Sequence, residues 1–306
     1  MDQNGTLFSG SRNGGPQRPQ VGTAIPKRLI QTGRKSQPLI NRAAMANVRM
    51  LNPDFEYLFF DDLAVDEFLE SDFPEYRKVF RGFQFPIQRY DFFRYLAVYR
   101  YGGFYLDLDV FLASGLSSLL NCNSVFPFEE LTVNAYLRDV RNMDWEIGNY
   151  AFGAAPGHPF LKKVIENCVK AQEDPAWTKC MMRGMFGLMK SEYTVLNTTG
   201  PGLLSRTLAE NPELAKTVTV LFPDNVCDVD KWHRFGELGV HLMGGSWRPR
   251  THFLRRRLAV YVEARKQEQS LKYGLKLGNQ RQHIGNTNSE TLRERVPALT
   301  GQALVP

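Results

Sequence analysis

The sequence predicts an α/β fold with a mostly parallel central sheet flanked by helices, and two observations lead to this prediction. Short apolar runs rich in β-branched and aromatic residues alternate with longer helical patterns along the chain. Turn residues such as Asn52 and Pro53 separate these segments. Chains with this alternation build sheets covered by helices, and such sheets bind ligands beyond the carboxyl ends of their strands.

The first part of the chain is expected to alternate strand and helix twice. The four elements lie, in order, at 27–31, 37–50, 56–60 and 63–70. Asp61 or Asp62 suits the N-cap of the last of these, because a short acidic side chain accepts hydrogen bonds from the first N–H groups of a helix. A longer helix is expected from Pro86 to Tyr101, since proline fits a first turn and Gly102 fits the stop.

The later part of the chain continues this rhythm between two polar ends. Strands are expected at 124–128, 149–154, 217–223 and 239–243, with helices at 158–171 and 200–210. The expected organisation is a disordered leader at 1–22, one domain at 23–250, a basic helix at 251–276 and a polar, flexible tail at 277–306.

Composition excludes several classes of protein. Of the 306 residues, 43% are hydrophobic and 23% are charged, which excludes disorder of the whole chain. No apolar run approaches the ~18 residues that cross a bilayer, and the N-terminus lacks the order of a signal peptide, so a cytoplasmic location is expected. The basic segment 248–266 either contacts an anionic membrane, such as the inner membrane face, or is a solvated helix face. No nucleic-acid partner is expected.

The segment "RYGGFYLDLDVFL", residues 100–112, carries two aspartates inside an apolar run. If the whole run is a strand, Asp107 and Asp109 share one face, because side chains alternate along a strand. Two unpaired buried carboxylates are costly, so a cation is expected beside them. Mg²⁺ or Mn²⁺ suits such oxygen ligands and commonly bridges carboxylates to the phosphates of a substrate. A nucleoside diphosphate is therefore the expected third party.

The helix before this segment carries a second pair of charges. Asp91 and Arg94 lie three residues apart, and hence on one face, in a helix that is apolar around most of its circumference. A buried acid and base beside the aspartates indicate either a polar site or a structural ion pair. The residues alone do not decide between these alternatives.

Six segments between about residues 24 and 250 combine these features. They read "IPKRLIQT", "NPDFEYLFFDD", "QRYDFFRYLAVYRYGGFYLDLDV", "NYAFGAAPGHPFL", "TTGPG" and "HLMGGSW". In this combination the chain resembles the D-x-D glycosyltransferases of family 32, which include fungal mannosyltransferases and are related to the glucosylating domains of clostridial toxins. The resemblance implies a GT-A, Rossmann-like nucleotide-binding fold. It also implies retaining transfer of a hexose from a UDP- or GDP-sugar to a glycan or lipid-linked acceptor.

The resemblance also implies roles for individual residues. Asp107, Asp109 and His241 would hold Mn²⁺ or Mg²⁺, with Asp109 the more direct ligand, and Asp91 and Arg94 would hold the donor sugar and act in catalysis. The remaining implied residues are Gln31, Thr32, Ser246 and Trp247 around the nucleotide, and Asn149, Gly200 and Pro201 in the sugar or acceptor pocket. For Gly200 and Gly202, the two glycines of "TTGPG", a structural role in a turn and at a helix start is the alternative.

One strand departs from the pattern of these enzymes. The first strand usually ends in His-Gln-Thr-Trp, whereas this chain has Ile30 and Gly33 at the two ring-bearing positions. The sequence therefore does not indicate how the base of the nucleotide is recognised. The alternative functions are a phosphohydrolase of the haloacid dehalogenase type, for which the D-x-D motif stands unusually late in the chain, and a nucleotide-sugar-binding module without turnover.

Overall fold

The computed structural model describes residues 22–183 and 190–242, with isolated positions between 260 and 272. At its centre lies a seven-stranded sheet with the order β2-β1-β3-β7-β5-β6, and β8 pairs with β5. The strands are β1 (Arg28–Thr32), β2 (Glu56–Phe60), β3 (Gly103–Leu106), β5 (Ser124–Leu131), β6 (Trp145–Ile147), β7 (Ala151–Ala154) and β8 (Thr219–Leu221).

The strand directions confirm the predicted sheet. Strands β2, β1 and β3 pair in parallel, and β8 is parallel to β5. Strand β7 is antiparallel to both β3 and β5, and β6 is antiparallel to β5. Five of the seven strands therefore run in one direction, with β6 and β7 reversed. The predicted α/β class is confirmed.

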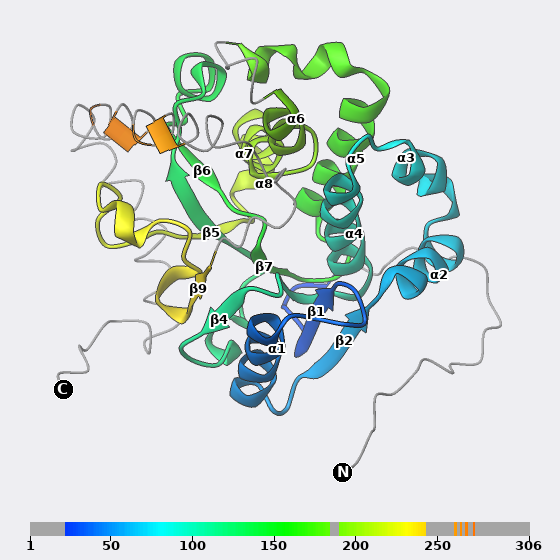
Figure 1. Cartoon of the computed structure of the whole chain (residues 1–306). Coiled ribbons are helices and arrows are strands. Elements are labelled where there is room, and N and C mark those ends of the chain that lie inside the picture. The colour runs from blue at the N-terminus through cyan, green and yellow to red at the C-terminus, as the bar shows by residue number, and fades with distance from the viewer. Residues whose placement is uncertain are drawn as a thin grey trace.

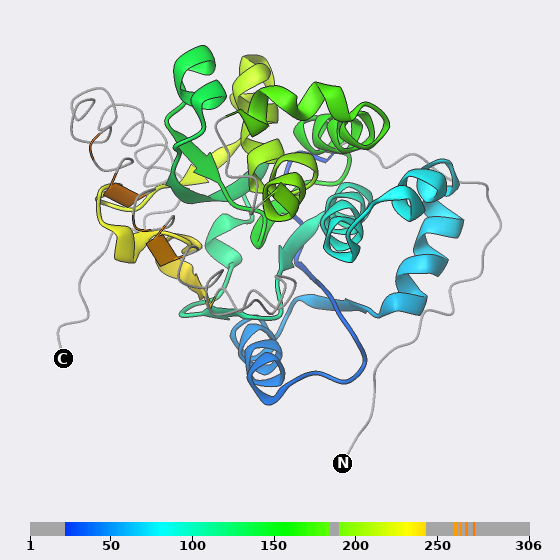
Figure 2. The same cartoon turned by 45° about the horizontal axis from the view of Figure 1, so that its top comes forward.

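Helices cover both faces of this sheet (Figures 1 and 2). They are α1 (Leu39–Leu51), α2 (Asp62–Asp72), α3 (Arg77–Gly82), α4 (Pro86–Tyr101), α5 (Pro159–Glu173), α6 (Lys190–Thr198), α7 (Pro201–Glu210) and α8 (Pro212–Ala215). Strand alternation separates two cores: Ile30 and Tyr105 pack with α4, α5 and α7, whereas Leu29 and Phe104 pack with Val48 of α1.

Several predicted boundaries match the structure. Helix α4 spans Pro86–Tyr101 as predicted, and Asp61 caps α2 by accepting a hydrogen bond from the Ala64 N–H at 2.9 Å. The turn from α4 into β3 requires two glycines, because Gly102 has φ of 65° and Gly103 has φ of 107°. A Cβ on Gly103 would lie 2.7 Å from the Arg28 carbonyl oxygen. Strand β6 and helices α3 and α6 were not predicted.

The prediction of one continuous strand through Asp107 and Asp109 is wrong. Strand β3 ends at Leu106, where its pairing with β7 ends, and β4 (Val110–Leu112) begins a second, two-stranded sheet with β9 (Gly239–His241). Between them the chain turns, and the Val110 N–H donates to the Asp107 carbonyl at 3.1 Å. The turn brings both carboxylates to the edge of the main sheet, so neither is buried within the core as a continuous strand would require.

Within the described ranges, no helix has both the length and the apolar composition to span a membrane.

Candidate metal and nucleotide-sugar site

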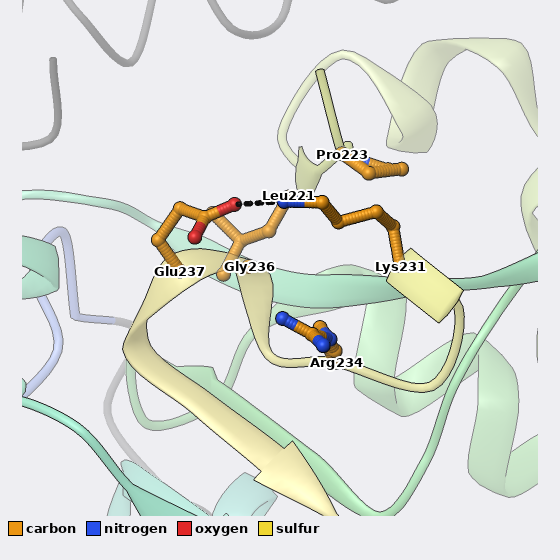
Figure 3. Close-up of a pocket in the computed structure, with 6 residues that line it drawn as sticks. All are labelled: Leu221, Pro223, Lys231, Arg234, Gly236 and Glu237. Carbon is orange, nitrogen blue, oxygen red and sulfur yellow. Dashed lines mark ion pairs between the residues drawn. The ribbon is translucent and has the colours of Figure 1, made fainter. Parts of the chain in front are cut away.

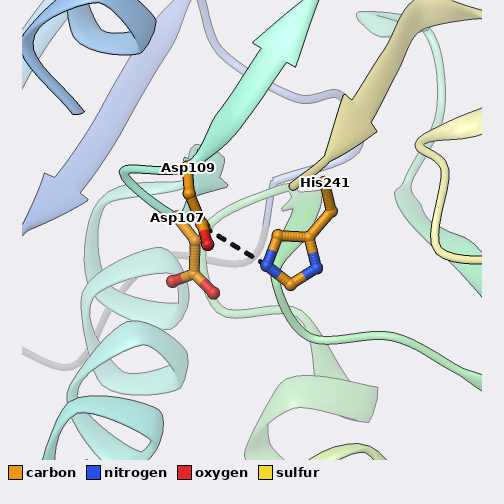
Figure 4. A group of neighbouring side chains, drawn as sticks. All are labelled: Asp107, Asp109 and His241. Atoms are coloured by element: carbon orange, nitrogen blue, oxygen red, sulfur yellow. Dashed lines mark ion pairs between the residues drawn. The ribbon is translucent and has the colours of Figure 1, made fainter. Parts of the chain in front are cut away.

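Three side chains from two distant segments meet at the turn between β3 and β4. Ligand atoms of Asp107, Asp109 and His241 all lie within 4.8 Å of one another. Pairing of Val110 with His241 in the second sheet places the histidine opposite the turn. Figure 4 shows the two carboxylates and the imidazole ring converging, with His241 Nε2 3.2 Å from Asp109 Oδ1. The structure thus brings together the three residues that the sequence analysis assigned to a metal.

This arrangement fits a divalent cation. Two carboxylates and one imidazole are donors that Mn²⁺ accepts readily, and Mg²⁺ favours the oxygen donors. The side chains of Asp107, Asp109 and His241 are 24%, 23% and 17% exposed, so an ion and its phosphate ligands can reach them from solvent. Asp107 also lies 3.2 Å from the Arg94 guanidinium and accepts a hydrogen bond from the Tyr105 hydroxyl at 2.8 Å.

Arg94 is the centre of a buried network behind the turn. Its guanidinium lies 3.2 Å from Asp91 Oδ1 and 3.2 Å from Asp107 Oδ1. It also donates to the Asn149 carbonyl at 2.7 Å, and it lies over the Tyr105 ring at 4.7 Å. The side chains of Arg94 and Asp91 are only 4% and 6% exposed, so this cation stabilises a buried carboxylate, and it also pairs with the partly exposed Asp107.

The electrostatics of the network follow from burial and pairing. Burial raises the pKa of Asp107, and the nearby Arg94 opposes that shift. Burial also raises the pKa of Asp91, again against Arg94. Burial alone would lower the pKa of Arg94, but the charge of Asp107 and Asp91 keeps that pKa above its ordinary value. Arg94 therefore remains a permanent cation at the site.

Asp91 is tied to two further segments. Its carboxylate accepts hydrogen bonds from Asn149 Nδ2 at 3.0 Å and from Thr199 Oγ1 at 2.9 Å. The Tyr95 hydroxyl links the same segments by donating to the Thr199 carbonyl at 2.7 Å. The structure thus brings Asp91, Arg94 and Asn149 into one network with Asp107, and the ion-pair interpretation of Asp91 and Arg94 describes their geometry.

Gln31 and Thr32, at the end of β1, lie at the same edge of the sheet but bond to protein. The Gln31 amide donates to the Leu106 carbonyl at 3.2 Å and accepts from the Tyr57 hydroxyl at 2.9 Å. The Thr32 hydroxyl donates to the Phe60 carbonyl at 2.8 Å. Both side chains are buried, so in this structure they support the edge from which Asp107 emerges.

The remaining predicted residues are placed as follows. Gly200 is the N-cap of α7 and Pro201 its first residue, directly after Thr199, which contacts Asp91. The Gly200 backbone is extended, so a role at the helix start accounts for its place in the fold. Ser246 and Trp247 lie outside the described residues, as does most of the segment 248–266. The roles assigned to all these residues stay predictions.

Tyr150 is a site residue that the sequence prediction did not include. Its ring stacks on the His241 imidazole with centroids 4.4 Å apart and planes at 14°. Its carbonyl accepts the Asp107 N–H at 2.7 Å. Among the described residues, no hydrogen-bond partner reaches the buried His241 Nδ1, so stacking on Tyr150 takes the orienting role that a hydrogen bond usually has for a ligating histidine. The position of Tyr150 next to Asn149 in the sequence was the one signal that could have indicated its role.

A separate shallow pocket lies on the segment before β9. Leu221, Pro223, Lys231, Arg234, Gly236 and Glu237 line it (Figure 3). Lys231 and Glu237 pair across it at 4.0 Å. None of the proposed metal ligands lines this pocket, so it is distinct from the site at the turn.

Comparisons with known proteins agree with this site. The profile of the glycosyltransferase sugar-binding region containing the DXD motif matches residues 41–128. The chain is 33% identical over 183 residues to inositol phosphoceramide mannosyltransferase 3 of Schizosaccharomyces pombe, covering 60% of this chain and 44% of that protein. It is 29% identical to mannosyl phosphorylinositol ceramide synthase SUR1 of Saccharomyces cerevisiae, covering 62% and 42%. The chain thus spans less than half the length of these relatives.

Solved structures give a weaker likeness. The PaToxG glycosyltransferase aligns with a TM-score of 0.39 at 18% identity, over 63% of this chain and 76% of that one. The ligand-free glycosyltransferase domain from the YGT toxin aligns with a TM-score of 0.43 at 10% identity, over 65% and 80%. The matched profile covers Asp91, Arg94, Asp107 and Asp109. Residues 41–128 therefore match the profile of the sugar-binding region of the DXD glycosyltransferases, and the chain is similar in sequence to yeast mannosyltransferases.

Proposed function

We propose that this protein is a metal-dependent glycosyltransferase of GT-A type that moves a hexose from a nucleotide sugar to a glycan or glycolipid acceptor with retention of configuration. The observation that carries the proposal is the convergence of Asp107, Asp109 and His241 beside the buried cation Arg94. The names of the relatives make mannose the first sugar to test and a phosphoinositol-bearing sphingolipid the first acceptor. The proposed location is the cytoplasmic face of a membrane.

In the proposed reaction, the bond between the sugar and the β-phosphate breaks and its electron pair goes to the phosphate oxygen. The acceptor hydroxyl oxygen forms the new glycosidic bond, and its proton passes to a leaving-group oxygen. A divalent cation held by Asp107, Asp109 and His241 would supply positive charge beside the diphosphate. Fixed charge of this kind is commonly the largest contribution to catalysis.

The residues of the chain have separate parts in this proposal. Arg94 is a fixed positive charge behind Asp107, and its position is set by Asp91 and the Asn149 carbonyl. Asp91, with its partners Asn149 and Thr199, sets the shape of the sugar-binding side. The phosphohydrolase alternative is less favoured, because it needs Asp107 as a free nucleophile, and Arg94 and the Tyr105 hydroxyl, at 2.8 Å, already hold that carboxylate.

The test is release of nucleoside diphosphate from a panel of UDP- and GDP-sugars, with Mn²⁺ or with a chelator. The proposal predicts release from one donor that depends on the metal and increases when the acceptor is added. Hydrolysis of an aryl phosphate, without release from any sugar nucleotide that binds, would instead support the phosphohydrolase. Donor binding without turnover in the presence of an inositol phosphoceramide acceptor would support a binding module.

A further inference from the structure

Helix α1 has an unusual outward face. Ala44 and Val48 are buried against the sheet, as expected for one side of a surface helix. The opposite side, which is normally polar, carries a stripe of apolar residues spaced at i, i+4, i+7 and i+11. This stripe consists of Leu39, Ala43, Ala46 and Met50. Leu39 is 74% exposed and Met50 is 77% exposed, so packing within the chain leaves most of each side chain uncovered.

The charged residues within the segment 33–53 are all basic, and Asp61, outside it, pairs with Lys35 at 3.4 Å. Arg42 and Arg49 border one side of the stripe on the exposed surface, where Arg49 also lies over the Tyr57 ring at 5.0 Å, and Arg34 and Lys35 precede the helix. From residue 33 to residue 53 the sequence contains no aspartate or glutamate. Ile40, which is 52% exposed, adds apolar surface at the start of the helix. A helix with an exposed apolar stripe bordered by arginines has the composition of one that lies in a membrane interface.

We propose that the outward face of α1 docks on an anionic lipid surface. The flanking arginines would contact lipid phosphates while Leu39 and Met50 enter the boundary of the acyl chains. A second copy of this chain fits the face less well. A two-fold contact would place Arg42 and Arg49 of both copies together, and this segment supplies no acidic residue to neutralise them.

The docking face is joined closely to the metal site. Asn47 of α1 makes two hydrogen bonds with Leu112 of β4: Nδ2 donates to the Leu112 carbonyl at 3.0 Å, and Oδ1 accepts its N–H at 2.7 Å. Strand β4 begins directly after Asp109 and pairs with His241. Figures 1 and 2 both show α1 at the periphery of the fold beside β4. A membrane under α1 would therefore hold the site in a fixed orientation.

The start of α1 lies on the same edge of the sheet as the two aspartates. A Cβ on Gly33 would lie 2.5 Å from Leu108 Cδ1, so the loop that leads from β1 into α1 packs against the turn between Asp107 and Asp109. Leu39 and Ile40 follow this loop. If the proposed function holds, docking would bring the donor sugar close to the head group of a lipid acceptor. The docking itself does not depend on that function.

The experiment is flotation of the full chain with vesicles of phosphatidylcholine, alone or mixed with phosphatidylserine. Wild type is expected to float with the anionic vesicles. Leu39→Gln combined with Met50→Gln should weaken partitioning about tenfold, because two exposed apolar side chains no longer enter the lipid. Arg42→Gln should weaken binding to anionic vesicles about fivefold and leave binding to neutral vesicles unchanged.

Matched controls test whether the effect belongs to this face. Val140→Gln removes another apolar side chain, 60% exposed, and Arg81→Gln removes another exposed arginine. Both should float like wild type. Equal flotation of wild type and the α1 variants would overturn the proposal. So would a dimer in sedimentation equilibrium that dissociates in the Leu39→Gln and Met50→Gln variant while vesicle binding is unchanged, which would assign the face to a second copy.

These outcomes are separable from the proposed function. Release of nucleoside diphosphate in detergent solution should be the same in wild type and the α1 variants, since none of these residues contacts the metal site. If the α1 variants lose flotation but release nucleoside diphosphate as wild type does, the docking proposal is supported independently of the proposed function. Normal flotation in a chain that releases no nucleotide from any donor would contradict the proposed function and leave the docking surface standing.

Discussion

Replacement of Arg94 by methionine tests the buried network most severely. The change removes the cation that lies 3.2 Å from both Asp91 and Asp107, while leaving a side chain of similar length. Breaking a buried ion pair by removal of one partner costs about 3–5 kcal/mol, because the other charge remains buried without compensation. Here two carboxylates are left, so we expect the free energy of unfolding to fall by at least that much and nucleotide release to be lost.

The assay is urea unfolding of wild type and Arg94→Met at two pH values. Since burial raises the pKa of Asp107, protonation of that carboxyl at low pH removes the charge that needs a partner. The destabilisation should therefore be smaller at pH 5 than at pH 7.5. Adding Asp91→Asn should also recover at least about 1 kcal/mol relative to the sum of the single changes.

Arg206 supplies a matched control for this experiment. Its side chain is 5% exposed, pairs with Glu210 at 2.8 Å and lies over the Trp177 ring at 3.6 Å, without contact to Asp107. Arg206→Met should destabilise the fold but leave the Mn²⁺ affinity of the folded protein unchanged. A cost below about 1 kcal/mol for Arg94→Met, or a cost independent of pH, would show that Arg94 does not stabilise the two carboxylates.

Three further predictions concern single residues. Tyr150→Phe should keep Mn²⁺ affinity within about twofold, whereas Tyr150→Leu should lower it about tenfold by calorimetry because the His241 ring loses its stacking partner; equal values would remove Tyr150 from the site. Burial lowers the pKa of His158 to about 4, so protons bind the unfolded chain preferentially below pH 6.5 and stability should fall by about 2 kcal/mol between pH 6.5 and 5. In His158→Gln most of this loss of stability at low pH should be absent from urea titrations. An unchanged dependence of stability on pH would show that His158 does not cause the loss. Gly103→Ala should cost about 1–3 kcal/mol in the same titrations, since φ is 107°, and a neutral effect would show that the turn can relax.

The sequence was sufficient to predict most of the fold because its local signals agree with the tertiary structure. Helix α4 begins at Pro86 and ends at Tyr101, because a proline ring suits its first turn and the positive φ of Gly102 terminates it. Strands β1 and β2 carry dense apolar runs. In contrast, β6 is only three residues long and α6 only nine, and such short elements are poorly identified by sequence periodicity.

The sequence indicated that Asp107, Asp109 and His241 lie together, but not the geometry that brings them together. Carboxylates two residues apart in an apolar run indicate a charged site whether the chain is extended or turned, so Asp107 and Asp109 were found although the strand breaks between Leu106 and Val110. The contacts of Thr199 and Tyr150 could not be predicted, because they depend on packing between segments far apart in the sequence. An aromatic residue that stacks on a histidine has the same sequence pattern as one that packs in the core, so periodicity does not identify it.

The central claim is that Asp107, Asp109 and His241 hold a divalent cation together. Its most direct test is electron paramagnetic resonance titration of Mn²⁺ into wild type, Asp109→Asn and His241→Gln, with circular dichroism to show that each variant is folded. We expect one Mn²⁺ site in wild type and affinity at least about tenfold weaker in both variants. Wild-type affinity in folded Asp109→Asn would contradict the claim.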